Sequence, residues 1–408
     1  MSTTRTTRAT RTTRFVSGAL IAAGAMGVAT DAAAQSSVTL YGAVDTALAY
    51  INNAGGHSKV YMRQGNLAAS KWGLTGNEDL GGGLSAIFDL QAGFDPDTGA
   101  ASSAGLLFNR EAYVGLKSKL YGQVTLGRQY TPYLLFVGPI SSSWALTGAT
   151  GAHPGDIDGL DTTIRINNAI VYNTPVISGL QASVMYALGG IPGSASKGQT
   201  FSGALKYSFG PVSLAAGYLQ LDNAGTNVTP TNPTPNFDPA STGSFGSSSL
   251  NIGYLSARSV RHAALAGNYT YGNLVVGLTY TNVRYLPGAN SIPAFTSTAV
   301  FNTYAALATY RFTPAFDVAA GYSYTLASKA NGIDSAARYQ QISLKQAYHL
   351  SKRTTLYALQ AYQHASGSTL NASGDIVNAT PSVGDIANGI GSTTRGQFVG
   401  MAGITVLF

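Results

Sequence analysis

The sequence lacks cysteine and long apolar runs, and it has few charges. Without cysteine there is no disulfide framework, so burial or backbone pairing has to stabilise the chain. Only 10% of the residues are charged and 45% are hydrophobic, yet beyond residue 34 no apolar run reaches the roughly eighteen residues that a membrane-spanning helix needs. These absences leave an all-β protein, either soluble or embedded in a membrane.

The first 34 residues have the composition of a secretory signal peptide. Residues 15–28 form a short apolar segment, and Ala32, Ala33 and Ala34 offer small side chains for cleavage before Gln35. The basic residues that precede the apolar segment are Arg5, Arg8, Arg11 and Arg14. A transit peptide is the alternative, because the segment is rich in Arg and Thr and poor in acids. The uninterrupted apolar segment favours export, and residues 35–408 are expected to form the mature chain.

The charge balance of the mature chain is mild. Cleavage removes four of the 24 basic residues and one of the 17 acids, so the formal net charge falls from +7 to +4. No cluster of basic residues suited to a phosphate backbone occurs in the mature part. The sequence therefore predicts no nucleic-acid partner.

What is present is an alternation of apolar and polar residues with a period of two, the pattern of half-buried strands. Residues 38–48, 180–186 and 316–325 are examples. Seven short turn-like links alternate with eight longer Gly-, Ser- and Asn-rich links, which gives fifteen connections and sixteen strands. The long links lie near residues 52–60, 94–107, 130–163, 188–199, 223–261, 284–300, 327–337 and 364–395. Strict alternation of this kind predicts an all-β fold, a 16-stranded antiparallel transmembrane β-barrel with an even strand number.

The third long link, residues 130–163, is too long for an ordinary loop. It contains Phe136 and Trp144, which need a surface to pack against, and three acids near its end, Asp156, Asp158 and Asp161. A barrel of about sixteen strands encloses a water-filled lumen. We therefore expect this loop to fold into the lumen, with the two aromatic side chains anchored on the wall and Asp156 and Asp158 facing water.

The alternation also predicts which charged residues of the wall face the loop. Lys71 and Glu111 have inward parity, and Arg165 does too if the flanking Ile164 and Ile166 face lipid. Arg110 has outward parity unless the strand is bulged. Arg128 also has outward parity, and it is expected either to line the pore or to tie the loop to the wall or to a neighbouring subunit.

Several segments resemble the general porins of β-proteobacterial outer membranes, and the resemblance covers nearly the whole mature chain. The segments are SSVTLYG at 36–42, SKWGLTGNEDLGGGL at 70–84, NREAYVGL at 109–116, GRQ at 127–129, RINNAIVY at 165–172, LSKRTTLY at 350–357 and the terminal Phe408. The resemblance implies a homotrimer of water-filled channels, each narrowed by its third loop. It also implies a basic ladder on the wall that includes Lys71 and Arg165. Glu111 stands where anion-selective members have a basic residue, so only a weak anion preference is expected.

The resemblance further implies the partners of the chain. These are membrane lipid and lipopolysaccharide, the outer-membrane assembly machinery through the strand that ends at Phe408, and small ions and hydrophilic solutes. No cofactor, metal site or enzymatic activity is expected. Of the five histidines, only His349 is expected near an acid. A substrate-specific channel, an outer-membrane hydrolase, and an adhesin that binds through residues 223–261 remain as alternatives.

Overall fold

The computed structural model describes residues 36–161, 164–194, 196–223, 248–385 and 391–408. The predicted signal peptide, residues 1–34, lies outside the described residues. So does most of the loop to which the adhesin alternative was assigned, since residues 224–247 are not described.

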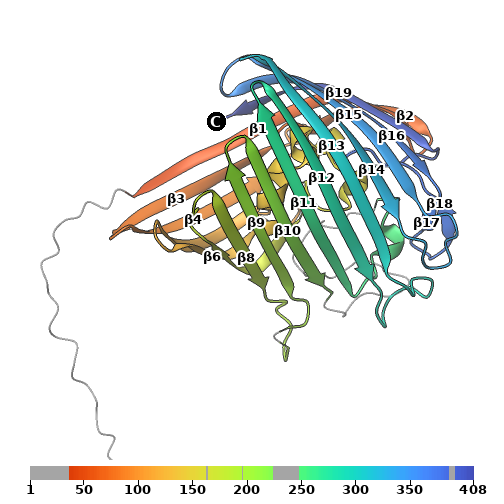
Figure 1. Ribbon diagram of the computed structural model, residues 1–408, viewed down its shortest axis with the longest axis horizontal. Coiled ribbons are helices and arrows are strands. Elements are labelled where there is room, and N and C mark those ends of the chain that lie inside the picture. The colour runs from red at the N-terminus through yellow and green to blue at the C-terminus, as the bar shows by residue number, and fades with distance from the viewer. Residues whose placement is uncertain (1–35, 162–163, 195, 224–247, 386–390) are drawn as a thin grey trace, which may run out of the picture.

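Seventeen strands form one antiparallel sheet that closes on itself through the pairing of β1 with β19 (Figure 1). The strands are β1 (Ser37–Ala54), β2 (His57–Gln64), β3 (Lys71–Gly81), β4 (Leu84–Gly93), β5 (Glu111–Ser118), β6 (Gly122–Tyr130), β7 (Arg165–Asn173), β8 (Leu180–Ala187), β9 (Thr200–Phe209), β10 (Val212–Asp222), β11 (Ser259–Tyr271), β12 (Leu274–Leu286), β13 (Ala299–Thr313), β14 (Phe316–Ala327), β15 (Arg338–His349), β16 (Thr354–Ser366) and β19 (Gly396–Leu407). β2 and β3 pair in succession with the two halves of β1 and share one place in the wall. The barrel therefore has the 16 wall positions that the sequence predicts.

The connections alternate between short turns at one end of the barrel and longer loops at the other, as expected from their sequences. The prediction of a long loop at residues 52–60 is wrong. The strands continue to Ala54 and resume at His57, and Gly55 and Gly56 alone make the turn, with φ of 64° and 99°. Glycine adopts this backbone conformation without steric cost, so two residues suffice.

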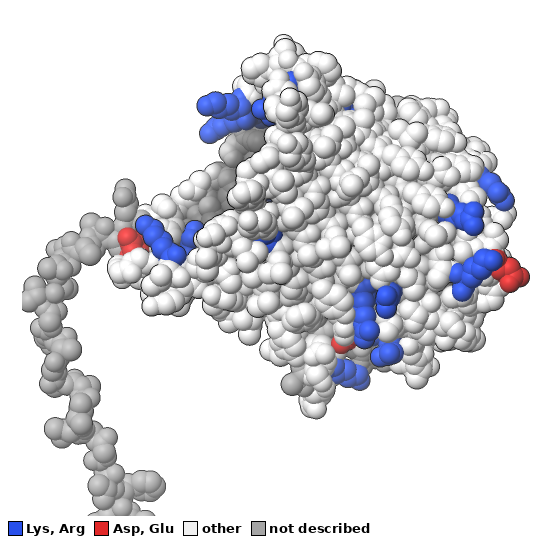
Figure 2. All heavy atoms as spheres, in the orientation of Figure 1, with Lys and Arg blue, Asp and Glu red and all other residues white. Residues whose placement is uncertain are grey.

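The wall is apolar outside and lined by small or polar side chains inside. Along β13, for example, Tyr304 is 53% exposed on the outer face, whereas the neighbouring Ala305 faces inward and is 6% exposed. Aromatic side chains with outward exposure gather near the short turns: Tyr207, Phe209, Tyr269, Tyr271, Tyr310, Phe312 and Tyr348. Figure 2 shows that the middle of one outer face is almost free of charge, while Lys and Arg gather toward the ends. This outer surface suits a hydrocarbon layer bounded by two interfaces.

The third loop, described over residues 131–161, folds into the barrel, where its yellow ribbon is seen behind the wall strands in Figure 1. It contains α1 (Pro132–Val137), the 3-10 turn η1 (Gly138–Ile140), α2 (Ser142–Ala145), α3 (Gly148–Gly151) and η2 (Pro154–Asp156). Thr131 caps α1, accepting a hydrogen bond from the Leu134 amide, and Pro132 occupies the first turn. None of the helices in the described ranges has both the length and the apolarity to cross a membrane.

Smaller elements lie in the long loops. η3 (Ile252–Tyr254) precedes β11, and β17 (Ser368–Leu370) pairs with β18 (Ile376–Asn378) in the last loop. Leu370 and Tyr254 belong to the same buried cluster as Ile157 and Leu160 of the third loop. The loop end of the barrel is therefore packed inward over the third loop.

Candidate functional site: a polar cavity in the lumen

The third loop is held first against β9 and β10. The backbone amide of Tyr133 donates to Ser202 Oγ at 3.1 Å. A Cβ on Gly217 would come within 3.0 Å of the Tyr133 ring, so α1 reaches the wall because that position has no side chain. Phe136 is 6% exposed, and the Lys206 ammonium lies 5.3 Å from the centre of its ring. A cation over an aromatic face stabilises this contact.

Trp144 does not anchor the loop to the wall, contrary to the expectation from the sequence. Its indole lies against η1, where a Cβ on Gly138 would be 3.2 Å from Trp144 Cε2, and it lines the polar cavity described below. The side chain is partly exposed.

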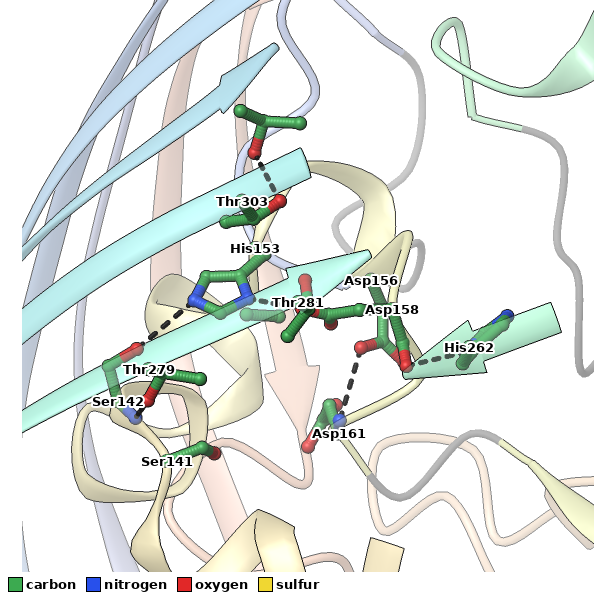
Figure 3. A network of polar contacts seen from close by, with 12 residues as sticks. Ser141, Ser142, His153, Asp156, Asp158, Asp161, His262, Thr279, Thr281 and Thr303 are labelled. Atoms are coloured by element: carbon green, nitrogen blue, oxygen red, sulfur yellow. Dashed lines mark hydrogen bonds and ion pairs between the residues drawn. The ribbon is translucent and has the colours of Figure 1, made fainter. Parts of the chain in front are cut away.

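A buried cluster of polar side chains holds the middle of the loop against β11 and β12 (Figure 3). His153 Nδ1 lies 2.5 Å from Asp158 Oδ2, and His153 Nε2 lies 3.1 Å from Ser142 Oγ. Thr281 Oγ1 donates to Asp158 Oδ2 at 2.9 Å, and the backbone oxygen of Asp158 lies 2.7 Å from His262 Nδ1. The cluster thus ties two turns of the loop to each other and to two wall strands.

The prediction that Asp158 faces water is wrong, since it is fully buried, and Asp156 is only 9% exposed. Asp156 Oδ1 accepts a hydrogen bond from the Asp161 amide, 3.1 Å away. Burial opposes the ionisation of Asp158, but the charge of His153 and the hydrogen bonds from His153 and Thr281 outweigh burial and lower the Asp158 pKa below its ordinary range. Both acids therefore serve the folding of the loop.

The contacts Ser142–His153–Asp158 join the three residue types of a serine-hydrolase triad, but the geometry does not support nucleophilic chemistry. A nucleophile has to meet its substrate, whereas Ser142 is 2% exposed and His153 is fully buried. The Ser142 amide is itself directed at Thr279 Oγ1, 3.4 Å away on the wall. We interpret the cluster as a clasp for the loop.

The far end of the loop contacts β15 and the last loop. Gln341 Nε2 donates to the carbonyl oxygens of Thr150 and Ala152, each at 3.0 Å. The Asp385 amide donates to the Gly148 carbonyl at 2.9 Å. The third loop therefore crosses the lumen from β9 to β15, and it borders a cavity on the side of β2 and β3.

This polar cavity has a volume of about 480 Å³. The wall and the third loop line it with charges of opposite sign. Its basic residues are Arg63, Lys71, Arg110 and Arg165, and its acids are Asp161 of the third loop and Asp385 of the last loop. A Cβ on Gly148 would lie 2.0 Å from Asp161 Oδ2, so glycine at that position lets the carboxylate lie over the backbone at the cavity edge. The two acids predicted to face water, Asp156 and Asp158, are not among the residues that line this cavity, whereas the third acid of the loop, Asp161, is.

The Tyr130 ring positions two of the arginines. The guanidinium carbons of Arg110 and Arg165 lie 5.7 and 5.3 Å from its centre. Gln91 Oε1 accepts a 2.7 Å hydrogen bond from Arg110 Nε. Arg110 precedes β5, so strand parity does not govern its direction, and it reaches the cavity without a bulge in the strand.

Arg165 also lines the cavity, but the reason predicted from the sequence is wrong. Ile164 and Ile166 do not face lipid; both are 1% exposed and pack with the third loop. A register shift between Gly127 and Gln129, together with a left-handed backbone at Asn168 (φ 52°), changes the parity of β7 at this level. Below the bulge, Ile170 is 45% exposed, as predicted.

Glu111 and Arg128 lie behind the cavity lining. Glu111 is within electrostatic range of Lys71, Arg110 and Arg165. Arg128 is 8% exposed and donates to the carbonyl oxygen of Asn109 at 2.8 Å and to Asn167 Oδ1 at 2.5 Å. Arg128 therefore joins β6 to the residues flanking β5 and to β7.

Sequence reasoning did not find Arg63 or Asp385. The Arg63 guanidinium and the Asp385 carboxylate are 2.6 Å apart, although the two residues are 322 positions apart in the chain. No local sequence pattern can therefore predict their contact. The histidine expected near an acid, His349, does lie 2.6 Å from Asp317 Oδ2. Within the described ranges, no three His, Asp or Glu side chains gather in a way that could hold a metal ion.

A family model described as "Gram-negative porin" matches residues 19–368, which is most of the chain. The chain belongs to the Gram-negative porin family. The architecture agrees, because 16 wall strands closed around an inward third loop form a porin barrel, and the protein is placed in the outer membrane.

Named relatives and a solved structure extend this result. The porin is 34% identical to an outer membrane porin protein of Bordetella pertussis over 51% of this chain and 60% of that relative. It is 37% identical to outer membrane porin protein 32 of Delftia acidovorans over 50% of this chain and 60% of the relative. The match thus spans about 60% of the length of these two relatives. A solved anion-selective porin from Comamonas acidovorans has a TM-score of 0.68 and 25% identity, covering 92% of this chain and 100% of that one.

Proposed function

We propose that this porin is a general diffusion channel for ions and small hydrophilic solutes, with a weak preference for anions. The observation that carries the proposal is the polar cavity, where Lys71, Arg110 and Arg165 of the wall face Asp161 of the third loop inside a 16-position barrel. Pore-lining charge selects ions by sign when it stands close to a narrow water path with low-dielectric walls. The similarity to the anion-selective porin from Comamonas acidovorans supports the sign.

The balance of charges supports a preference that is weak. Four basic residues line the cavity against the acids Asp161 and Asp385. Glu111 is within electrostatic range of three of these basic residues and weakens the basic side further. A positive surplus remains, which favours anions without excluding cations.

The proposal includes a homotrimer. Val38, Leu40 and Leu48 are 66%, 59% and 60% exposed on the outer face of β1 and would pack against a neighbouring copy. One structural neighbour, an outer membrane protein of Vibrio cholerae with 15% identity, has a trimer form. The rest of the outer face would contact membrane lipid and lipopolysaccharide. The strand that ends at Phe408 would engage the assembly machinery of the outer membrane.

Single-channel recording of the purified protein in a planar bilayer tests the proposal. We expect conductance steps in groups of three and a small reversal potential of anionic sign in a salt gradient. Absence of steps would contradict the diffusion channel, and a saturating, solute-specific block at low concentration would point to a dedicated channel. Cation preference would contradict the charge argument alone.

A further inference from the structure

A second element enters the lumen besides the third loop. Between β2 and β3, residues 65–70 leave the wall, because Thr46 pairs with Gln64 and Ala43 with Lys71. Six residues therefore stand opposite only two residues of β1. All six line the polar cavity. We name residues 65–70 the inward segment.

The inward segment is folded around one carboxylate, that of the fully buried Asp45. Asp45 Oδ1 accepts hydrogen bonds from the amide and the side chain of Asn66, at 2.9 and 3.1 Å, and from the Tyr357 hydroxyl at 2.7 Å. Its Oδ2 accepts from the amides of Leu67 and Ala68, at 2.9 and 3.0 Å. Charge-assisted bonds to successive backbone amides are strong, so Asp45 fixes the shape of the segment.

Arg63 connects the inward segment to the last loop, which lies between β16 and β19. Its Nη1 donates to Asn66 Oδ1 at 2.5 Å, and its Nη2 lies 2.6 Å from Asp385 Oδ1 of the last loop. The arginine side chain is 3% exposed and the aspartate side chain 12%. Asp385 in turn donates its amide to Gly148 of the third loop. One ion pair thus joins the inward segment, the last loop and the third loop on the cavity side.

We propose that the Arg63–Asp385 ion pair is a latch that sets the width of the constriction, and that Asp45 is the positioning residue that holds the latch in place. This inference rests on the proposed diffusion channel. Because the two charges neutralise each other, the latch acts on the cross-section of the water path, while Lys71, Arg110 and Arg165 act on ion preference. Opening the latch should therefore raise conductance whichever partner is removed.

Charge variants separate the latch from simple electrostatics. Arg63→Gln and Asp385→Asn change the charge in opposite directions. If both residues acted only through their electric field, the two single variants would shift the reversal potential in opposite directions. The variant with the two charges exchanged would then differ from the wild type and from both single variants. As a latch, both single variants raise single-channel conductance, and the exchange Arg63→Asp with Asp385→Arg returns it toward the wild-type value. Lys352→Gln, at an exposed turn, is the control for loss of one positive charge.

A reversible cross-link gives a second test in one channel. The chain has no cysteine, so Arg63→Cys with Asp385→Cys introduces the only two thiols, which a reducible bis-thiosulfonate reagent can bridge. We expect wild-type conductance while the bridge is intact and a rise when it is reduced. The single variant Arg63→Cys, treated in the same way, controls for the attached reagent. Asp45→Asn should raise conductance as well, and the intact bridge should suppress that rise.

Three outcomes decide the matter. If conductance is the same before and after the bridge is reduced, the latch is wrong. If the charge exchange leaves conductance as high as in the single variants, the ion pair does not set the width and the latch is again wrong. If the wild-type protein itself gives no conductance steps, the proposed channel fails first, which distinguishes the two proposals. Should Asp45→Asn fail to fold, the cysteine pair still tests the latch.

Discussion

Gly42 and Phe408 exchange two backbone hydrogen bonds, each 3.0 Å long, where the first wall strand meets the end of the chain. A Cβ on Gly42 would lie 2.4 Å from Phe408 Cζ and 2.5 Å from the Lys71 carbonyl oxygen. The aromatic ring thus covers the bare backbone of Gly42 at the seam of the barrel. Close packing at the seam therefore requires a small residue at position 42 and a large one at position 408.

We expect Gly42→Ala to lower the free energy of unfolding by about 1–3 kcal/mol, the usual cost of overpacking. Gly203→Ala is the matched control, because a Cβ there has no neighbour closer than 3.8 Å. Urea unfolding in detergent, followed by the shift between folded and unfolded bands on a gel, measures both. Equal stability of the two variants would contradict the close contact at the seam.

Replacing Lys71 and Arg165 together by Glu should move the reversal potential in a salt gradient toward cations. Glu111→Lys should move it in the opposite direction, because Glu111 lies within range of the same basic residues. The measurement belongs at low ionic strength, where screening is weakest. Lys352→Glu places a similar charge change at an exposed turn and should leave the potential unchanged. An unchanged potential in the first two variants would remove these residues from the constriction.

Neutralising Asp161 and neutralising Asp158 in the third loop should have different effects on the channel. Asp161→Asn removes a negative charge from the cavity and should increase anion preference, with a smaller loss of stability than Asp158→Asn. Asp158→Asn leaves His153 buried without its carboxylate, and breaking a buried pair costs about 3–5 kcal/mol. That loss should appear as a noisier current and as proteolysis within the third loop. If Asp158→Asn only shifted ion preference, the buried clasp would be wrong.

Acid should release the third loop from the wall. The Asp158 pKa is lowered in the folded protein, so its contribution to docking is fully present above the ordinary pKa of an aspartate, about 4, and is lost as the pH falls below that value toward the folded pKa. We expect proteolysis in the third loop to rise below about pH 4 while the barrel stays folded. Asp158→Asn should make the rise disappear, since the variant has no carboxylate to titrate there.

The sequence predicts the wall better than the lumen. Turns and alternation are local, so strands such as β14, where residues 316–325 alternate, follow from them. The sequence assigns Ile164 and Ile166 to the lipid face, which is wrong. A strand face covered by the third loop excludes water as a lipid-covered face does, so apolar residues at a period of two occur on both. The left-handed backbone at Asn168 then shifts the parity of Ile164 and Ile166.

The contents of the constriction could be predicted only in part. Lys71 reaches the cavity by regular strand parity, and the third loop is conspicuous by its length. Asp158 and Asp161 are chemically alike and three positions apart. Asp158 is nevertheless buried against His153, whereas Asp161 lines the cavity. Arg63 meets Asp385 only because the barrel closes. Contacts made between distant parts of the chain leave no local signal in the sequence.

The third loop leaves the wall after β6, but the side chains that hold it belong to strands made later: Ser202 on β9, Thr281 on β12 and Gln341 on β15. Long-range contacts form slowly, because the intervening chain has to be ordered first. During synthesis and insertion the loop therefore waits, with Phe136 and Tyr133 uncovered, until more than half of the wall strands exist. The constriction of the lumen therefore forms last. Before that, the folding barrel has a wider lumen and exposes more apolar surface than the finished channel.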